Sequence, residues 1–269
     1  MTSARIAIAA LLSLGIAACA RQETPAPAAQ TAAPQPSPAA VDPQSLLTIP
    51  ARFPGDADED VWRKSPQVLA FMNVKPGMQV LDYLAGGGYY SELLSGLVGP
   101  TGRVYAYNNP DYARYSGDTP AKRYANSRLA NVTELTGPPE TLTIEPGSLD
   151  AVLFQQTYHD LHWLSKDGSW TPTDPAKSLA QVVTALKPGG VVVVVDHVAA
   201  AGSDPDVSVE AMHRIDPALV KREFEAAGLV FDAESQVFHN PADDHSKPVF
   251  DESIRHKTDQ FTYRFRKPS

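Results

Sequence analysis

From residue 67 onward, short apolar runs alternate with segments whose apolar positions recur every three or four residues. Apolar runs bounded by turn residues are typical of buried strands, and the three-to-four spacing is typical of helices that pack on a sheet. Several such strands separated by helices predict a mostly parallel sheet with helices on both faces. The expected strands are 79–83, 104–107, 132–136, 151–155 and 191–195, and the expected helices are 67–72, 89–97, 121–130 and 175–186.

The last part of the chain has a different pattern. Residues 217–227 are helical in pattern, whereas 229–238 and 261–266 have strand patterns joined by a polar segment. Consecutive strands without a crossover helix pair in antiparallel fashion. The sequence therefore predicts an α/β, Rossmann-like fold whose sheet ends in an antiparallel edge hairpin at its C-terminal side.

The N-terminus has the pattern of an export signal. Arg5 precedes the apolar stretch IAIAALLSLGIAA, which is short for a membrane span and ends in small residues before Cys19, the single cysteine. Ile16 to Cys19 resembles the signal of bacterial lipoproteins, which implies removal of residues 1–18 and lipidation of Cys19. An ordinary secretory signal that leaves a free thiol is the alternative.

Residues 19–46 are rich in proline and alanine and nearly lack large apolar side chains, so we expect a disordered tether. The folded domain is expected at 47–269. Ala20 and Arg21 lack the aspartate associated with inner-membrane retention in similar lipoproteins. We therefore expect an exported protein on the periplasmic face of the cell envelope, held by its lipid and most consistent with the outer membrane.

Composition narrows the classes of partner. The hydrophobic fraction of 43% is sufficient for a sizeable core, and the formal net charge is -8. A nucleic-acid surface requires clustered basic residues, and the sequence contains no basic block. We therefore expect no nucleic-acid partner.

A glycine-rich loop follows the first expected strand. Asp82 lies at the end of that strand, Ala85, Gly86, Gly87 and Gly88 follow, and a helix begins near Tyr89. Glycines permit close approach of a ligand to the backbone, and the free N–H groups of a helix start favour polar ligands. Ligands of open α/β sheets bind at the carboxyl ends of strands, so these residues predict a nucleoside-type site. A tight turn without a ligand is the alternative.

Several motifs together resemble class I S-adenosylmethionine-dependent methyltransferases over residues 74–267. They are the loop after VLD, PGSLDAVLF, LKPGG before a strand, and the closing strand pair. AGGGYYSELL, YHDL, HRIDP and NPADDHSKPVF are more narrowly similar to a bacterial group of exported methyltransferases. The resemblance implies a seven-stranded sheet, with S-adenosylmethionine as cofactor over the ends of the first two strands.

The same resemblance assigns cofactor-binding positions. Asp82 matches the acidic residue of the glycine motif, and Gly86 and Gly88 match its second and third glycines. Leu84 stands in the place of the first glycine. Asn108 stands where the family usually has a carboxylate that binds the ribose, and Pro138 where an acidic residue commonly meets the adenine. A neutral amide forms weaker hydrogen bonds than a carboxylate, so Asn108 implies weakened ribose binding.

Polar residues follow two of the later strands. His159 and Asp160 come after strand 151–155, and Asp196 and His197 end strand 191–195, so both pairs are expected at the edge that carries the glycine loop. A histidine beside a carboxylate can remove a proton from a methyl acceptor, and His159 with Asp160 is the predicted catalytic pair. The alternative is that these side chains only pack and cap a turn.

A metal site is another interpretation of these polar residues. His and Asp residues are frequent in the expected loops, but the HxxH spacing of His159 and His162 lies in a loop without fixed helical geometry, so no metal ligand is predicted. Residues 240–247 are long, polar and bounded by prolines, which is typical of a lid or substrate loop.

The sequence thus predicts a methyltransferase that transfers a methyl group from S-adenosylmethionine to a small molecule or an envelope component. The alternative is a non-catalytic lipoprotein that uses the same cleft to bind a ligand or metal. The expected partners are a small-molecule substrate and, through the lipid, a membrane; the oligomeric state is not predicted.

Overall fold

The computed structural model describes Met1 and residues 40–269. Apart from Met1, the expected signal peptide lies outside the described residues, as do Cys19 and most of the expected tether. Residues 40–269 belong to one compact unit.

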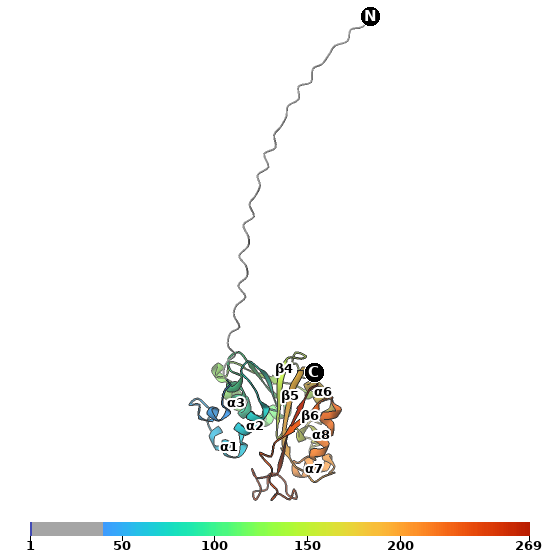
Figure 1. Cartoon of the computed structure of the whole chain (residues 1–269). Helices are drawn as coiled ribbons and strands as arrows, with labels where there is room; N and C mark the ends of the chain where they lie inside the picture. Colours follow the sequence, from blue (N-terminus) through green and yellow to red (C-terminus); the bar gives the residue numbers. More distant parts are fainter. Residues whose placement is uncertain (2–39) are drawn as a thin grey trace. The chain divides into compact units, whose positions relative to one another are not determined.

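A single seven-stranded sheet forms the centre of residues 40–269 (Figure 1). Its strand order is β3-β2-β1-β4-β5-β7-β6, in which β1 to β5 are parallel and β7 runs antiparallel to both β5 and β6. The strands are β1 (Gln79–Tyr83), β2 (Arg103–Asn108), β3 (Val132–Thr136), β4 (Leu149–Gln155), β5 (Leu186–His197), β6 (Val230–Glu234) and β7 (Gln260–Arg266).

Helices connect the strands and cover the sheet. The α-helices are α1 (Asp56–Arg63), α2 (Ser65–Met72), α3 (Tyr89–Val98), α4 (Pro110–Ser116), α5 (Thr119–Tyr124), α6 (Pro175–Ala185), α7 (Pro205–Met212) and α8 (Pro217–Ala226). Short 3-10 turns are η1 (Pro43–Thr48), η2 (Ala125–Ser127), η3 (Pro139–Thr141) and η4 (His159–His162). Proline at the first turn of most of these helices fixes the backbone where no N–H is required.

Both faces of the sheet are buried, as the continuous apolar runs of its strands require. Alternate residues of β5 belong to two separate cores: Val192 and Val194 pack with α6 and α8, whereas Val193 and Val195 pack with α2 and α3. Figure 1 shows α2 and α3 on one side of the sheet and α6 and α8 on the other. The predicted α/β fold with helices on both faces and an antiparallel C-terminal edge is confirmed.

Two predicted elements were too long. The expected helix 121–130 ends at Tyr124, because Asn126 and Ser127 have φ values of 56° and 55°, which a helix does not accommodate. The expected strand 229–238 ends at Glu234, where pairing with β7 stops. The segment 235–259 instead forms a long excursion that lies below the sheet in Figure 1.

The packed domain begins before the expected boundary at residue 47. Leu46 in η1 is buried, and its side chain lies against Gly96 of α3, where an added Cβ would come within 2.7 Å of Leu46 Cδ2. One apolar residue in a proline-rich region gave no periodic signal, so the sequence pattern missed this contact.

None of the helices within the described residues is both long enough and apolar enough to cross a bilayer. The order in which strands are added to the sheet reverses between β1 and β4, because β2 and β3 lie on one side of β1 and β4 and β5 lie on the other. Open α/β sheets bind ligands at this point, beyond the carboxyl ends of the strands.

Candidate functional site

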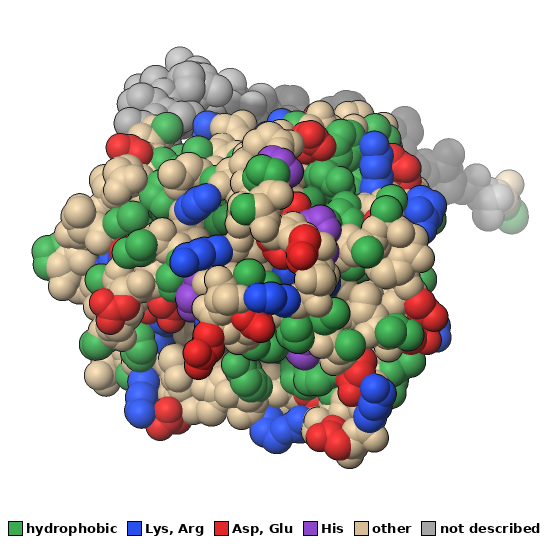
Figure 2. Space-filling model, turned by 90° about the horizontal axis from the view of Figure 1, so that it is seen from below, with side chains coloured by type: hydrophobic (Ala, Val, Ile, Leu, Met, Phe, Trp, Pro, Cys, Tyr) green, Lys and Arg blue, Asp and Glu red, His purple; other side chains and the backbone are tan. Residues whose placement is uncertain are grey.

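Two neighbouring cavities lie at the carboxyl edge of the sheet, on the face that Figure 2 views from below. We call the cavity of about 320 Å³ around the glycine loop the loop cavity. The second, of about 480 Å³, is lined by aromatic and histidine side chains, and we call it the aromatic cavity. Tyr112, Tyr115 and Gln156 line both.

Most of the predicted cofactor-binding residues line the loop cavity. Asp82, Ala85, Gly86, Gly87 and Tyr89 do so, together with Leu84, Gln155 and Thr157. Gly88 lies directly behind the loop, where an added Cβ would come within 2.2 Å of the Tyr124 hydroxyl. Glycine at this position therefore serves the packing of α5 against the loop.

Leu84 has the backbone conformation of a glycine. Its φ of 56° lies in the left-handed region, and Gly86 and Gly88 also have positive φ values of 57° and 84°. A non-glycine residue in this region is strained and persists where its surroundings fix it. The buried Leu84 side chain packs in the core that contains α6 and α8, which supplies that constraint.

Asn108, like Gly88, is a predicted cofactor-binding residue that lies outside the lining of the loop cavity. Its Oδ1 accepts a hydrogen bond from the Gly86 N–H at 2.9 Å, and its Nδ2 donates to the Gly86 carbonyl oxygen at 3.0 Å. The side chain is buried, so in this structure its polar atoms hold the glycine loop.

Asp82 is buried beneath the loop cavity at the end of β1. Its Oδ2 accepts a hydrogen bond from Ser91 Oγ at 2.6 Å, which ties the strand to α3. Burial raises the pKa of Asp82 to about 6, against the lowering effects of Ser91 and the nearby Arg63.

A network of ion pairs and hydrogen bonds holds the glycine loop in place. Arg123 donates to the Gly87 carbonyl oxygen at 2.6 Å and pairs with Asp56 and Glu92, and all three side chains are buried. Arg128 also binds Glu92. The network joins α1, α3 and α5 around the loop, so the loop is fixed by residues far apart in the sequence.

One buried polar atom at the loop cavity lacks a partner. Gln155 is 9% exposed, and its Oε1 accepts no hydrogen bond from the described residues. Buried amide oxygens normally have a donor. An adenosyl ligand carries amino and hydroxyl donors, and the side-chain-free backbone at Gly86 and Gly87 leaves room for it, so the residues of this cavity fit S-adenosylmethionine.

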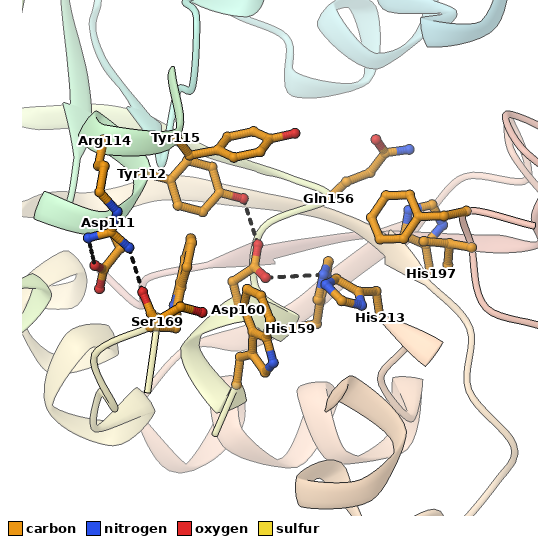
Figure 3. Close-up of a pocket in the computed structure, with 14 residues that line it drawn as sticks. Asp111, Tyr112, Arg114, Tyr115, Gln156, His159, Asp160, Ser169, His197 and His213 are labelled. Atoms are coloured by element: carbon orange, nitrogen blue, oxygen red, sulfur yellow. Dashed lines mark hydrogen bonds and ion pairs between the residues drawn. The ribbon is translucent and has the colours of Figure 1, made fainter. Parts of the chain in front are cut away.

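The predicted catalytic residues lie together at the aromatic cavity (Figure 3). The Tyr112 hydroxyl donates to Asp160 Oδ2 at 2.6 Å, and Asp160 Oδ1 lies 3.4 Å from His159 Nε2. On the other side, His159 Nδ1 lies 2.7 Å from Asp196 Oδ1, and the His159 backbone N–H donates to Asp196 Oδ2. His159 is thus held between two carboxylates, where the sequence suggested one.

The carboxylates determine the protonation of His159. Burial alone would lower its pKa, but Asp160 and Asp196 raise the pKa to about 9, so the ring is an imidazolium at neutral pH. Burial lowers the pKa of His197 to about 3 and that of His213 to about 4. The aromatic cavity therefore contains one charged and two neutral imidazoles, and at neutral pH His159 has no free lone pair with which to act as a base.

His162, Asp243 and His245 are further potential metal ligands, and each pairs with a residue outside this group. His162 pairs with Glu223, while Asp243 pairs with the fully buried Arg214, and His245 pairs with Asp259. Within the described residues, no group of three or more His, Cys, Asp or Glu side chains has an arrangement that could hold a metal ion.

Tyr112, Tyr115 and Gln156 line both cavities and form the wall that they share. The sequence pattern did not predict these residues, although one local signal indicates the helix that carries the two tyrosines. Asn109 and Pro110 directly follow β2, and an Asn followed by Pro is a strong helix start. Asn109 Oδ1 accepts from the Tyr112 backbone N–H at 2.8 Å, which begins α4 at the carboxyl edge. That helix carries Tyr112 and Tyr115 to the wall between the cavities.

Residues 81–194 match the family described as methyltransferase domain. A protein-L-isoaspartate O-methyltransferase from Aeropyrum pernix is 47% identical over 51 residues, which are 19% of this chain and 20% of that protein. The chain therefore spans about a fifth of the length of this curated relative.

The fold is similar to solved structures that cover most of the chain. A SAM-dependent methyltransferase from Aquifex aeolicus matches 84% of this chain and 98% of its own, with 19% identity and a TM-score of 0.56. An arsenic(III) S-adenosylmethionine methyltransferase from Chlamydomonas reinhardtii matches 87% of this chain and 75% of its own, with 19% identity and a TM-score of 0.50. The cyclase SpnF matches 78% of this chain and 82% of its own, with 14% identity and a TM-score of 0.57.

These similarities confirm the Rossmann-like methyltransferase fold. The domain match supports a methyltransferase that uses S-adenosylmethionine, and the solved neighbours, which are less than 25% identical, show the shared fold.

Proposed function

We propose that this chain transfers a methyl group from S-adenosylmethionine in the loop cavity to a small molecule in the aromatic cavity. The proposal rests on the observation that the two cavities share a wall. Tyr112, Tyr115 and Gln156 line both, so a donor on one side and an acceptor on the other would meet at these residues. Holding two reactants in contact supplies much of the barrier reduction for a transfer of this kind.

The glycine loop and its surroundings would hold the cofactor. Gly86 and Gly87 leave the backbone accessible, and Gln155 Oε1 offers a buried acceptor to an N–H or O–H donor. Asp82, Ala85 and Tyr89 of the predicted set also line this cavity, while Asn108 fixes the loop through Gly86. When bound, S-adenosylmethionine supplies an electrophilic methyl group on a sulfonium sulfur.

The acceptor's proton requires a destination on the protein. Tyr112 Oη lies at the shared wall and is hydrogen bonded to Asp160 Oδ2. In this proposal Tyr112 Oη takes the proton from the acceptor O–H or N–H while its own proton moves to Asp160 Oδ2. Burial raises the pKa of Asp160, which makes its carboxylate a better proton acceptor than an exposed one. His159 then acts as the positive charge that holds Asp160 and Asp196 in place.

Titration calorimetry of the purified full chain with S-adenosylmethionine and S-adenosylhomocysteine tests the cofactor. We expect micromolar binding of both ligands. Absence of binding up to millimolar concentration would contradict the methyltransferase proposal and favour a non-catalytic binding protein. Tyr112→Phe tests the proton route in turnover assays with an identified acceptor: kcat should fall roughly 100-fold or more with little change in KM for the cofactor.

We further propose that the protein works in the cell envelope, as a member of an exported bacterial group of methyltransferases. This proposal rests on the apolar N-terminal stretch and on Cys19 as the site of lipidation. Its partners would be the small-molecule or envelope acceptor and, through the lipid, the outer membrane. Mass spectrometry of the N-terminal peptide from the native source tests it: an unmodified chain that starts at Met1 would contradict export.

A further inference from the structure

The aromatic cavity is bounded by rings that contact one another in sequence. Ring centroids are separated by 6.4 Å between Tyr115 and Tyr112, and by 5.4 Å between Tyr112 and Trp170. The series continues at 4.8 Å to Trp163, 5.0 Å to His213 and 4.9 Å to Phe250. We call these six residues the ring arc, and all six line the aromatic cavity.

The ring arc is assembled from distant parts of the chain. Tyr112 and Tyr115 come from α4, Trp163 and Trp170 from the segment after η4, His213 from the end of α7, and Phe250 from the excursion 235–259. Its two ends are open to solvent, because Tyr115 is 83% exposed and Phe250 is 58% exposed, whereas Trp170 in the middle is 8% exposed. Exposed large aromatic side chains at the rim of a buried aromatic wall are typical of a ligand entrance.

The charged side chains of the aromatic cavity are already paired with one another. Arg114 binds Asp111 and the Ser169 carbonyl oxygen, as Figure 3 shows, and Asp160 is held by Tyr112 and His159. A charged ligand would lose its hydration here without gaining an unpaired opposite charge, which is costly in a buried site.

Two further features concern neutral polar groups. The buried Trp170 Nε1–H has no acceptor within the described residues. The His213 ring contacts other rings, but its nitrogens form no hydrogen bond within the described residues, and burial together with the charge of His159 keeps its pKa low. A neutral ligand with an oxygen or nitrogen on an aromatic ring would offer partners to such groups.

We propose that the methyl acceptor is a neutral, planar aromatic molecule with a ring hydroxyl or ring N–H, bound against the ring arc. This inference deepens the proposed function and rests on it, because it names the acceptor class of the same transfer. The flat walls favour stacking and edge-to-face contacts, and the paired charges disfavour ionic ligands.

Calorimetry of the full chain with four probes tests the proposal. They are 2-naphthol, the anion 2-naphthoate, the cation 2-naphthylmethylammonium and the saturated alcohol decahydro-2-naphthol. We expect 2-naphthol to bind about tenfold or more tightly than either ion, because of the desolvation cost of charge. We expect it to bind roughly fivefold more tightly than the saturated alcohol, because aromatic contacts exceed area burial. Equal or tighter binding of any of the other three probes would overturn the proposal.

Substitutions locate the binding. Trp163→Leu and Trp170→Leu should each weaken 2-naphthol binding roughly fivefold or more, and Trp170→Phe should recover most of the affinity. Trp62→Leu changes the one tryptophan outside the aromatic cavity and should leave the affinity unchanged. If Trp163→Leu and Trp170→Leu fold, as circular dichroism and thermal unfolding would show, but bind 2-naphthol like the parent chain, the proposal is wrong.

The same samples separate the two proposals. S-Adenosylhomocysteine binding that persists while 2-naphthol fails to bind would overturn the acceptor class and leave the methyltransferase proposal intact. Binding of 2-naphthol without S-adenosylhomocysteine would support the ligand class of the aromatic cavity and contradict methyl transfer.

Discussion

Asn108 and Gly86 are joined by two hydrogen bonds that run in opposite directions. The Gly86 N–H donates to Asn108 Oδ1 at 2.9 Å, and Asn108 Nδ2 donates to the Gly86 carbonyl oxygen at 3.0 Å. An amide can make both bonds, whereas a carboxylate can make only the first. The neutral residue at this position therefore matches the conformation of the glycine loop.

Asn108→Asp is accordingly expected to destabilise the protein by about 1 to 3 kcal/mol, because it places a carboxylate oxygen against a carbonyl oxygen in a buried site. Urea unfolding measures the change. Asn109→Asp is the matched control, since Asn109 uses only its Oδ1 to cap α4 and aspartate caps equally well. A loss of stability no larger than that of the control would show that the donated bond is unimportant.

Substitutions at Leu84 test whether the backbone of the glycine loop is left-handed at this position. At ordinary positions alanine is more stable than glycine, but at φ of 56° the order should reverse, because only glycine adopts this conformation without strain. Leu84→Gly should therefore be roughly 1 kcal/mol more stable than Leu84→Ala, although both lose a buried side chain. If Leu84→Ala is the more stable of the two in urea unfolding, the backbone at this position is not left-handed.

A substitution of Gln155 tests the role of its Oε1, the buried acceptor at the loop cavity that has no hydrogen-bond donor within the described residues. Gln155→Met removes an unsatisfied buried acceptor, so the free energy of unfolding should not fall. S-Adenosylhomocysteine binding should weaken roughly tenfold, because a ligand donor loses its acceptor. Calorimetry and urea unfolding check the two halves. A stability loss with unchanged affinity would mean that Gln155 has a structural role alone.

Arg123 tests the ion network around the glycine loop. Arg123→Met leaves Asp56 and Glu92 buried without this partner, which should cost about 3 to 5 kcal/mol. The neighbouring Lys122→Met breaks an exposed pair with Asp118 and should change stability by less than about 1 kcal/mol. Similar losses for the two variants in chemical denaturation would argue against a buried network.

Titration of His159, His197 and His213 tests the charge state of the three imidazoles at the aromatic cavity. In nitrogen-detected NMR, His159 should titrate near pH 9, and His197 and His213 should stay neutral down to about pH 5. Asp196→Asn should lower the His159 pKa, since it removes a carboxylate that stabilises the imidazolium while burial remains. An unchanged His159 pKa in that variant would exclude the contact with Asp196.

The same pKa values determine how stability depends on pH. The pKa of His159 is raised on folding, so its contribution is full below about pH 6.5 and is lost as the pH rises through about 9. His197 and His213 have lowered pKa values, so their contribution is present above about pH 6.5 and is lost as the pH falls toward 4 and 3. In the His159→Gln variant, the loss of stability between pH 7 and 9 should be smaller than in the parent chain.

The sequence by itself determined the sheet and the location of the loop cavity. The strands 79–83 and 132–136 were predicted with the bounds that the structure shows, because apolar periodicity is a local property of the chain. The glycine loop was found for the same reason: its signal is contained in a few consecutive residues. The number of strands followed from the resemblance to a known family and not from the periodicity, and the order of the strands came only from the structure.

Only the tertiary structure decided the rest of the site. The second carboxylate on His159, the bond between Asn108 and Gly86, and the ring arc all join residues from separate segments. No local pattern encodes such contacts, because they depend on where each strand ends and on how the following loop turns. The protonation of His159 follows from those contacts. For that reason our proposal passes the acceptor's proton to Tyr112 and Asp160 and not to His159.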